Sequence, residues 1–252
     1  MTNYSIAEEY TLPSQGKVYV QKINPVIKLR SMTTEEEMKR LSPNERQYKN
    51  MCEIIDDCMI ENPGISSYDM CLADYQFLLH KLRIVTYGSD YKVVSTCPFC
   101  GSTNHSVFDL DSLLVTSCDL DELQKYMELE LPKTKKKIRL TLQTPRLLDE
   151  VVVKNNEVRK KSKGKAPDST LVYTLQSLIS TVDGQYLDAI KLEEFVRNLP
   201  MMDTNYIMKY AQKLVESFGM ENSIESTCSM CGLDYRSSFR FTSEFFGPSI
   251  DI

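Results

Sequence analysis

The sequence is poor in the residues and motifs on which most enzymes rely. It has two histidines and nine glycines among 252 residues. It contains no G-x-S-x-G, no H-E-x-x-H and no glycine-rich phosphate loop. We expect His80 to be a partly exposed helix residue and His105 to lie in a turn. Because no nucleophile, acid–base pair or phosphate cradle is recognisable, we assign no catalytic residue and predict neither enzymatic activity nor a small-molecule substrate.

Long apolar runs are also missing. No stretch of the sequence is apolar for long enough to cross a membrane. The first residues, Met1–Ser5, do not show the basic and then apolar pattern of a secretory signal. We therefore expect a cytosolic protein that does not contact a membrane.

The charge balance is acidic, with 30 Lys and Arg against 35 Asp and Glu and a formal net charge of −5. Such a balance is atypical of a general nucleic-acid binder. The exception is a basic segment, residues 154–170, which includes Lys160, Lys161 and Lys163. Because it is polar and contains Gly and Pro, we expect a solvated surface loop. Contact of these lysines with an acidic partner surface, or with DNA, is the alternative.

Two matching cysteine motifs are the most informative feature that is present. Residues 95–101 read STCPFCG and residues 226–232 read STCSMCG. Each motif offers two thiolates across a tight turn, and the Gly after the second Cys can take a positive φ. Two such turns facing each other form a tetrahedral zinc site. We predict that structural Zn²⁺ is bound by Cys97, Cys100, Cys228 and Cys231.

The number of ligands decides what this zinc can do. Four thiolates fill a tetrahedral shell and leave no position for a water, so the site is structural. The other four cysteines lie on apolar helix faces or at helix starts, and we expect them to be buried free thiols: Cys52, Cys58, Cys71 and Cys118. A disulfide framework is the alternative, and a reducing cytosol disfavours it.

The similarity extends beyond the cysteines at the same offset of 131 residues (228 − 97). It pairs Tyr75 with Tyr206, Tyr87 with Phe218, Gly88 with Gly219 and Phe108 with Phe239. Before each Gly, residues 72–85 and 206–218 show apolar residues three and four apart, which predicts a helix. After each motif, residues 106–110 and 238–242 resemble strands.

A front half of the repeat occurs at a shorter offset of 111 residues. Ile27-Lys28-Leu29 corresponds to Ile138-Arg139-Leu140, and Thr33 corresponds to Thr144; Leu12-Pro13 recurs as Leu131-Pro132. Thr33 and Glu36 fit a capping box, and Thr144 precedes a proline at the first helical position. Because the offset grows from 111 to 131 residues, the second copy contains about twenty extra residues. We place them in the basic segment, since insertions are expected in surface loops.

These observations predict an α+β fold with an internal duplication. The two copies, 1–117 and 118–252, would be strand-plus-helix lobes joined into one compact unit by a shared four-cysteine zinc ribbon. Chance similarity of short amphipathic segments is the alternative, and the constant offset over Tyr, Gly and Cys positions disfavours it.

The order of several short motifs resembles a known family. The second half has Val182-Asp183-Gly184, Leu199-Pro200, the second cysteine motif and Phe245-Phe246-Gly247-Pro248. The first half has Leu12 to Gly16 and Leu29 to Thr33. Over most of its length, the chain resembles the baseplate hub and baseplate-assembly proteins of contractile-tailed phages of the T-even type.

The resemblance implies a structural or assembly role in the phage tail, without enzymatic activity. The implied partners are other baseplate or tail proteins. The implied location is the host cytoplasm during assembly, and the virion tail baseplate for members that stay in the particle.

A zinc-ribbon nucleic-acid-binding phage protein is the competing hypothesis. A ribbon that contacts phosphates is expected to carry Lys or Arg on its strands. Residues 96–110 have neither, and the second half of the ribbon has only Arg236 and Arg240. Binding of nucleic acid is therefore disfavoured.

The C-terminal segment is a candidate for partner binding. If it is extended, adjacent Phe245 and Phe246 point to opposite sides. One ring would cover the protein's own ribbon, and the other would dock into a neighbouring subunit. The alternative is that both rings fold back onto the core.

Overall fold

The structure is a computed structural model that describes residues 7–163, 165–221, 223–238 and 243–246. Its helices are α1 (Thr34–Leu41), α2 (Gln47–Cys58), α3 (Leu72–Tyr87), α4 (Leu120–Met127), α5 (Pro145–Lys161), α6 (Thr170–Leu178), α7 (Ala189–Arg197) and α8 (Met201–Glu216), with short 3-10 helices η1 (Leu110–Ser112) and η2 (Ser243–Phe246). Its strands are β1 (Ala7–Thr11), β2 (Val26–Arg30), β3 (Asp90–Thr96), β4 (Thr103–Asp109), β5 (Val115–Thr116), β6 (Glu128–Glu130), β7 (Lys137–Leu140), β8 (Ile179–Val182), β9 (Gly219–Met220), β10 (Ser223–Thr227) and β11 (Asp234–Ser238). The mixture of helices with small antiparallel sheets is compatible with the predicted α+β class.

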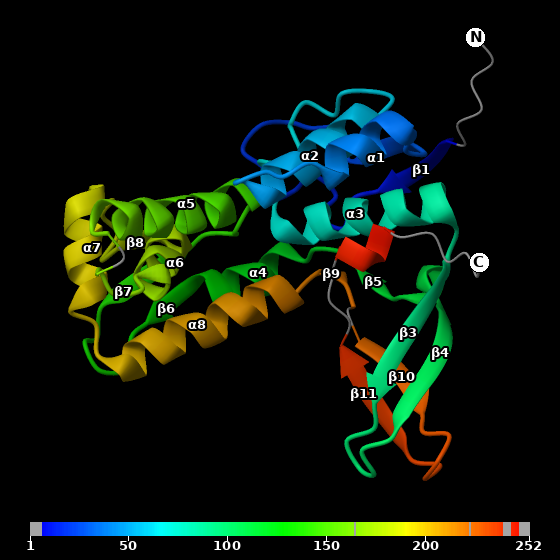
Figure 1. Cartoon of the computed structure of the whole chain (residues 1–252). Coiled ribbons are helices and arrows are strands. Elements are labelled where there is room, and N and C mark those ends of the chain that lie inside the picture. Colours follow the sequence, from blue (N-terminus) through cyan, green and yellow to red (C-terminus); the bar gives the residue numbers. More distant parts are fainter. Residues whose placement is uncertain (1–6, 164, 222, 239–242, 247–252) are drawn as a thin grey trace.

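Three parts can be followed in Figure 1. The first lobe contains β1, β2 and α1 to α3, and the second lobe contains β6 to β8 and α4 to α8. The hairpins β3–β4 and β10–β11 lie side by side and project away from both lobes. We call these two hairpins, residues 90–109 and 223–238, the ribbon arm. Its two halves come from the middle and the end of the chain, as the cysteine spacing predicts.

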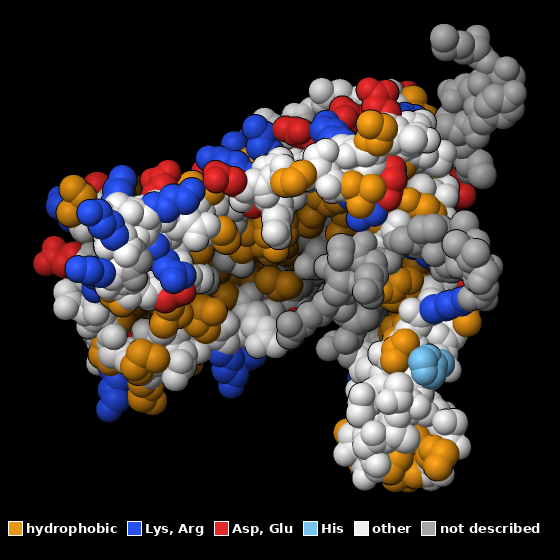
Figure 2. All heavy atoms as spheres, in the orientation of Figure 1, with side chains coloured by type: hydrophobic (Ala, Val, Ile, Leu, Met, Phe, Trp, Pro, Cys, Tyr) orange, Lys and Arg blue, Asp and Glu red, His pale blue; other side chains and the backbone are white. Residues whose placement is uncertain are grey.

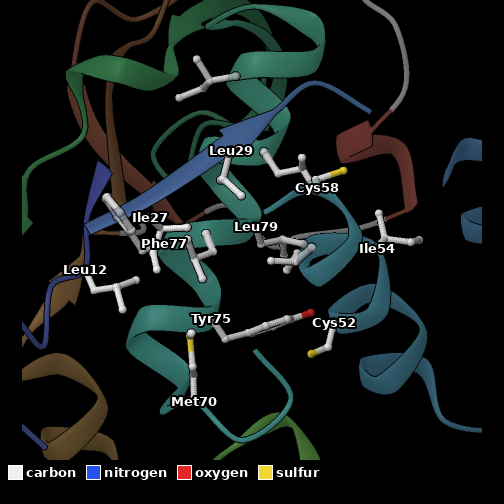
Figure 3. Close-up of a cluster of buried hydrophobic side chains, with 14 of the residues drawn as sticks. Leu12, Ile27, Leu29, Cys52, Ile54, Cys58, Met70, Tyr75, Phe77 and Leu79 are labelled. Carbon is white, nitrogen blue, oxygen red and sulfur yellow. The ribbon is translucent and has the colours of Figure 1, made fainter. Parts of the chain in front are cut away.

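The first lobe is built around α3. Strands β1 and β2 pair antiparallel, with Tyr10 opposite Ile27, and Ile27 and Leu29 of β2 are buried in the same cluster as the apolar side chains of α3. Figure 3 shows the core between β2, α2 and α3. The labelled side chains Leu29, Cys58, Tyr75 and Leu79 belong to one buried cluster. Because α3 is covered on most sides, even its polar residues Asp74, His80 and Arg83 are buried.

The second lobe has its own core. Strands β6, β7 and β8 form an antiparallel sheet in that order. Ile138 and Leu140 of β7 pack with Ile207 and Leu214 of α8 in a second buried cluster. The two lobes meet where Asp149 of α5 accepts hydrogen bonds from two backbone N–H groups at the start of α2, those of Tyr48 (3.3 Å) and Lys49 (2.8 Å).

Both lobes use a buried aspartate to hold a Leu-Pro turn. Asp74, the third residue of α3, accepts hydrogen bonds from the backbone N–H and the hydroxyl of Ser14. Asp203, the third residue of α8, accepts them from the backbone N–H groups of Lys133 (2.8 Å) and Thr134 (2.9 Å). Both carboxylates are fully buried. Each carboxylate accepts hydrogen bonds from donors that would otherwise be unsatisfied, and it thereby holds a turn against its helix.

The predicted capping box is present at the start of α1. The Thr33 side chain accepts from the Glu35 backbone N–H, and the Glu36 carboxylate accepts from the Thr33 backbone N–H at 2.7 Å. Arg30 donates a further hydrogen bond to Glu36 at 2.6 Å. The Arg30 guanidinium, followed by the Thr33 donors, lowers the pKa of Glu36 to about 2.

The depressed pKa of Glu36 predicts a pH dependence of stability. The carboxylate stabilises the fold fully above its unfolded pKa of 4.5, and this contribution is lost as the pH falls towards 2. We expect Glu36→Gln to reduce the unfolding free energy by about 1–2 kcal/mol at pH 7 and by almost nothing at pH 2. Denaturant titrations across this range check it, with Glu35→Gln, exposed in the same turn, as the control. A pH-independent loss would contradict the assignment.

Two expectations about the helices are wrong. The segment expected to be a surface loop, residues 154–170, is helical up to Lys161, because α5 runs on from its Thr144 cap with Val151 and Asn155 buried four residues apart. His80 is fully buried, not partly exposed, and its Nε2 lies 3.0 Å from the Leu110 carbonyl oxygen. Burial lowers the pKa of His80 to about 4.

Candidate metal centre

The ribbon arm consists of two hairpins, and each ends in one cysteine motif. The register of β3 and β4 runs from Asp90 opposite Asp109 to Thr96 opposite Thr103. That of β10 and β11 runs from Ser223 opposite Ser238 to Thr227 opposite Asp234. The cysteine turns therefore lie at the tip of the arm, farthest from the lobes (Figure 1).

The two turns have the same backbone geometry. In the first, the Gly101 N–H donates to the Cys97 carbonyl oxygen at 2.9 Å. In the second, the Gly232 N–H donates to the Cys228 carbonyl oxygen, also at 2.9 Å. Gly101 and Gly232 have φ of 73° and 72°, a region in which a side chain is strained. This explains why each CxxC pair is followed by Gly.

The turns bring all four predicted ligands together. The Sγ atoms of Cys97, Cys100, Cys228 and Cys231 all lie within 4.8 Å of one another. Cys97 Sγ is 3.7 Å from Cys231 Sγ, and Cys100 Sγ is 3.6 Å from Cys228 Sγ. Zinc–sulfur bonds of about 2.3 Å at tetrahedral angles give sulfur–sulfur separations of about 3.8 Å. The cluster therefore has the size of a tetrahedral four-thiolate site.

The arrangement is nearly symmetric. Exchanging the two turns maps the contact of Cys97 with Cys231 onto that of Cys228 with Cys100. The first cysteine of each turn is buried, whereas Cys100 and Cys231 are exposed. One side of the cluster thus faces the arm and the other faces solvent.

Polar neighbours act on the sulfur atoms. The Ser102 hydroxyl lies 3.1 Å from both Cys100 Sγ and Cys228 Sγ. It is the main cause that lowers the pKa of Cys228 to about 5, and it also lowers the pKa of Cys100. Asn104 Oδ1 accepts from the Ser229 backbone N–H at 2.9 Å, which ties the first hairpin to the second turn.

The fourth thiol shows why a cation fits here. The Leu233 backbone N–H lowers the pKa of Cys231, yet burial and the three neighbouring sulfur atoms raise it to about 12. Four thiolates at this spacing repel one another, so all four ionise only with a bound cation between them.

A side-chain contact supports the pair of hairpins below the cluster. Ser95 Oγ and Tyr235 OH are 2.6 Å apart and buried. Tyr235 packs with Cys97 and Cys228 in a small apolar cluster of its own. No sequence pattern indicates this contact, because Ser95 and Tyr235 do not occupy equivalent positions of the repeat.

The remaining predicted site residues lie elsewhere. Lys160 pairs with Glu45 at 3.4 Å, with both side chains largely exposed. Lys161 and Lys163 are exposed at the end of α5 and just beyond it. Cys52, Cys58, Cys71 and Cys118 are buried thiols, as expected. His105 lies in strand β4 opposite Val94, not in a turn as expected. It is exposed and does not belong to the four-cysteine cluster found among the described residues.

The prediction that one aromatic ring of the C-terminal segment is free to dock is corrected by the structure. Phe245 and Phe246 are 0% and 4% exposed. They lie on the 3-10 turn η2 rather than an extended stretch, so both rings pack on the first lobe. The buried Arg83 holds this turn by donating from Nε to the Phe245 carbonyl oxygen at 2.8 Å. The alternative that both rings fold back onto the core describes the structure.

The chain was compared with known protein families. Residues 3–247 match the family described as "T4 bacteriophage base plate protein". The chain belongs to this family. The resemblance to T4-type baseplate proteins, which the short motifs indicate, is thereby confirmed over nearly the whole chain.

Neither the comparison with curated proteins nor that with solved structures gave a match. Among the described residues of this baseplate protein, every helix is too short or too polar to span a bilayer.

Proposed function

We propose that this baseplate protein is a zinc-braced structural or assembly component of the hub region of the contractile tail. The observation that carries the zinc brace is the cluster of four Sγ atoms within 4.8 Å, contributed by turns 131 residues apart. Four cysteines form a closed shell, so the metal holds protein segments together and has no position for a substrate.

The zinc would join two hairpins that have little other stabilisation. Each hairpin of the ribbon arm is two-stranded, and an isolated two-stranded hairpin is marginally stable in water. The apolar cluster between the hairpins consists of Cys97, Cys228 and Tyr235. Zinc would therefore supply much of the free energy that keeps the arm folded.

We also propose that the two lobes arose by duplication, with the boundary near residue 117. Supporting observations are the equivalent turns at the metal cluster and the aspartate at the third position of both α3 and α8. Each aspartate binds the residues that follow a Leu-Pro pair. The zinc would then lie close to an approximate twofold axis.

The partners we propose are other baseplate or tail proteins, met in the host cytoplasm during assembly. Nucleic-acid binding remains the competing hypothesis. It is disfavoured because residues 93–108 and 226–233, the distal half of the ribbon arm, contain no Lys or Arg.

Mass spectrometry of purified tails and assembly intermediates tests the role. We expect the chain in finished baseplates or in intermediates that contain hub proteins, and we expect accumulation of incomplete baseplates when its gene is inactivated. Normal, infectious tails without the chain would contradict the proposal. Salt-dependent DNA binding by the purified protein would favour the competing hypothesis.

A further inference from the structure

The tip of the ribbon arm combines exposed apolar side chains with an absence of charged residues. Phe99 and Met230, the residues directly before the second cysteine of each motif, are 62% and 78% exposed. Leu233, which directly follows the second motif, is 50% exposed. On the face of the arm visible in Figure 2, the end of the arm shows hydrophobic and uncharged side chains; a pale blue histidine lies higher up the arm, and no Lys, Arg, Asp or Glu is seen at the end. The chain as a whole is 26% charged, so this composition is local.

The metal gives this uncharged tip a net charge. Four thiolates and one divalent zinc sum to −4 + 2 = −2. Within residues 93–108 and 226–233 there is no Lys or Arg to balance it. Two of the four sulfur-bearing side chains, Cys100 and Cys231, are exposed beside the apolar residues. The tip is thus apolar and anionic at once, and it lies at the end of the arm (Figure 1).

We propose that the ribbon tip docks into an apolar pocket, rimmed by Lys or Arg, on a neighbouring tail protein. Phe99 and Met230 would enter the pocket, as buried aromatic and apolar anchors commonly do. The basic rim would face the exposed sulfur atoms, because complementary charge sets the orientation and partner of an interface. A second copy of this chain fits less well, since two tips of charge −2 repel each other. The inference rests on the proposed zinc site.

Substitutions that introduce a positive or a negative charge at one position of the tip test the sign of the charge on the partner surface. Thr103 is exposed and lies opposite Thr96 at the end of the hairpin. We expect Thr103→Lys to reduce the yield of finished baseplates about tenfold more than Thr103→Glu, because like charges across an interface are strongly unfavourable. Zinc content is measured for both proteins, so that loss of metal is separated from loss of docking. If the two variants reduce the yield of baseplates equally, or if Thr103→Glu reduces it more, the proposal is overturned.

Photo-cross-linking identifies the protein that binds the ribbon tip. A photo-cross-linking amino acid replaces Phe99 in infected cells that assemble tails. We expect a product with another tail protein, cross-linked at a peptide with apolar residues and a nearby Lys or Arg. The same amino acid at Met38, which is 67% exposed on α1, is the matched control and should not give this product. Dimers of this chain, products with nucleic acid, or no product would overturn the inference. If the purified protein binds no zinc, the proposed function fails as well; if it binds zinc and no product forms, only the inference fails.

Discussion

Replacing Cys228 by Ser should remove the metal and unfold the ribbon arm while the lobes stay folded. Cys228 is buried, contacts Ser102 and Cys100, and anchors the second turn to the first. Structural zinc contributes about 10–16 kcal/mol of apparent folding free energy in small zinc fingers, so we expect the arm to lose on the order of 5 kcal/mol or more. Hydrogen exchange localises the loss, and elemental analysis reports the metal.

Cys52→Ala is the matched control for this experiment. Cys52 is also a buried thiol, but it packs between α2 and α3 in the first lobe. Its replacement should leave the zinc content unchanged and cost about 1–2 kcal/mol through packing alone. If Cys228→Ser leaves exchange in the arm unchanged, the cysteine cluster does not brace the arm.

Phe245→Ala should be the most destabilising apolar truncation outside the metal site. The ring is fully buried, lies 5.4 Å from the Tyr91 ring and stacks on His80 at 6.0 Å, measured between centroids. Removal of such a ring costs about 3–5 kcal/mol, because the cavity does not fully collapse. The midpoint of urea denaturation reports the loss.

The control for this truncation is an exposed phenylalanine. Phe99→Ala removes the same atoms from a ring that is 62% exposed, and it should change the unfolding free energy by less than about 0.5 kcal/mol. If Phe245→Ala has an equally small effect but blocks assembly, the segment is a docking element, as first expected from its adjacent aromatic residues.

The metal cluster was predictable because its signal is local. Two cysteines and a glycine within five residues determine each turn, and the repeated spacing shows that the turns belong together. Helices α3 and α8 were predictable for the same reason, since their apolar residues recur three and four apart. Capping of α1 by Thr33 and Glu36 also depends on neighbouring residues alone.

Contacts between distant segments could not be predicted in this way. Arg83 would ordinarily be assigned to the surface, yet it is fully buried because the Phe245 carbonyl, 162 residues later, accepts from it. The contacts of Asp74 and Asp203 could not be predicted either, because the turns that they bind lie 60 and 70 residues earlier in the chain. The basic segment is expected to be a loop because of its charge. The residues that make it helical, the N-cap of α5 and the buried side chains of that helix, precede most of its lysines in the sequence.

The brace itself is tested most directly by X-ray absorption at the zinc edge, combined with elemental analysis, on full-length protein purified without chelator. The account predicts about one zinc per chain, surrounded by four sulfur atoms at about 2.3 Å. Protein that is folded and assembly-competent without metal, or zinc bound mainly by nitrogen or oxygen, would contradict it.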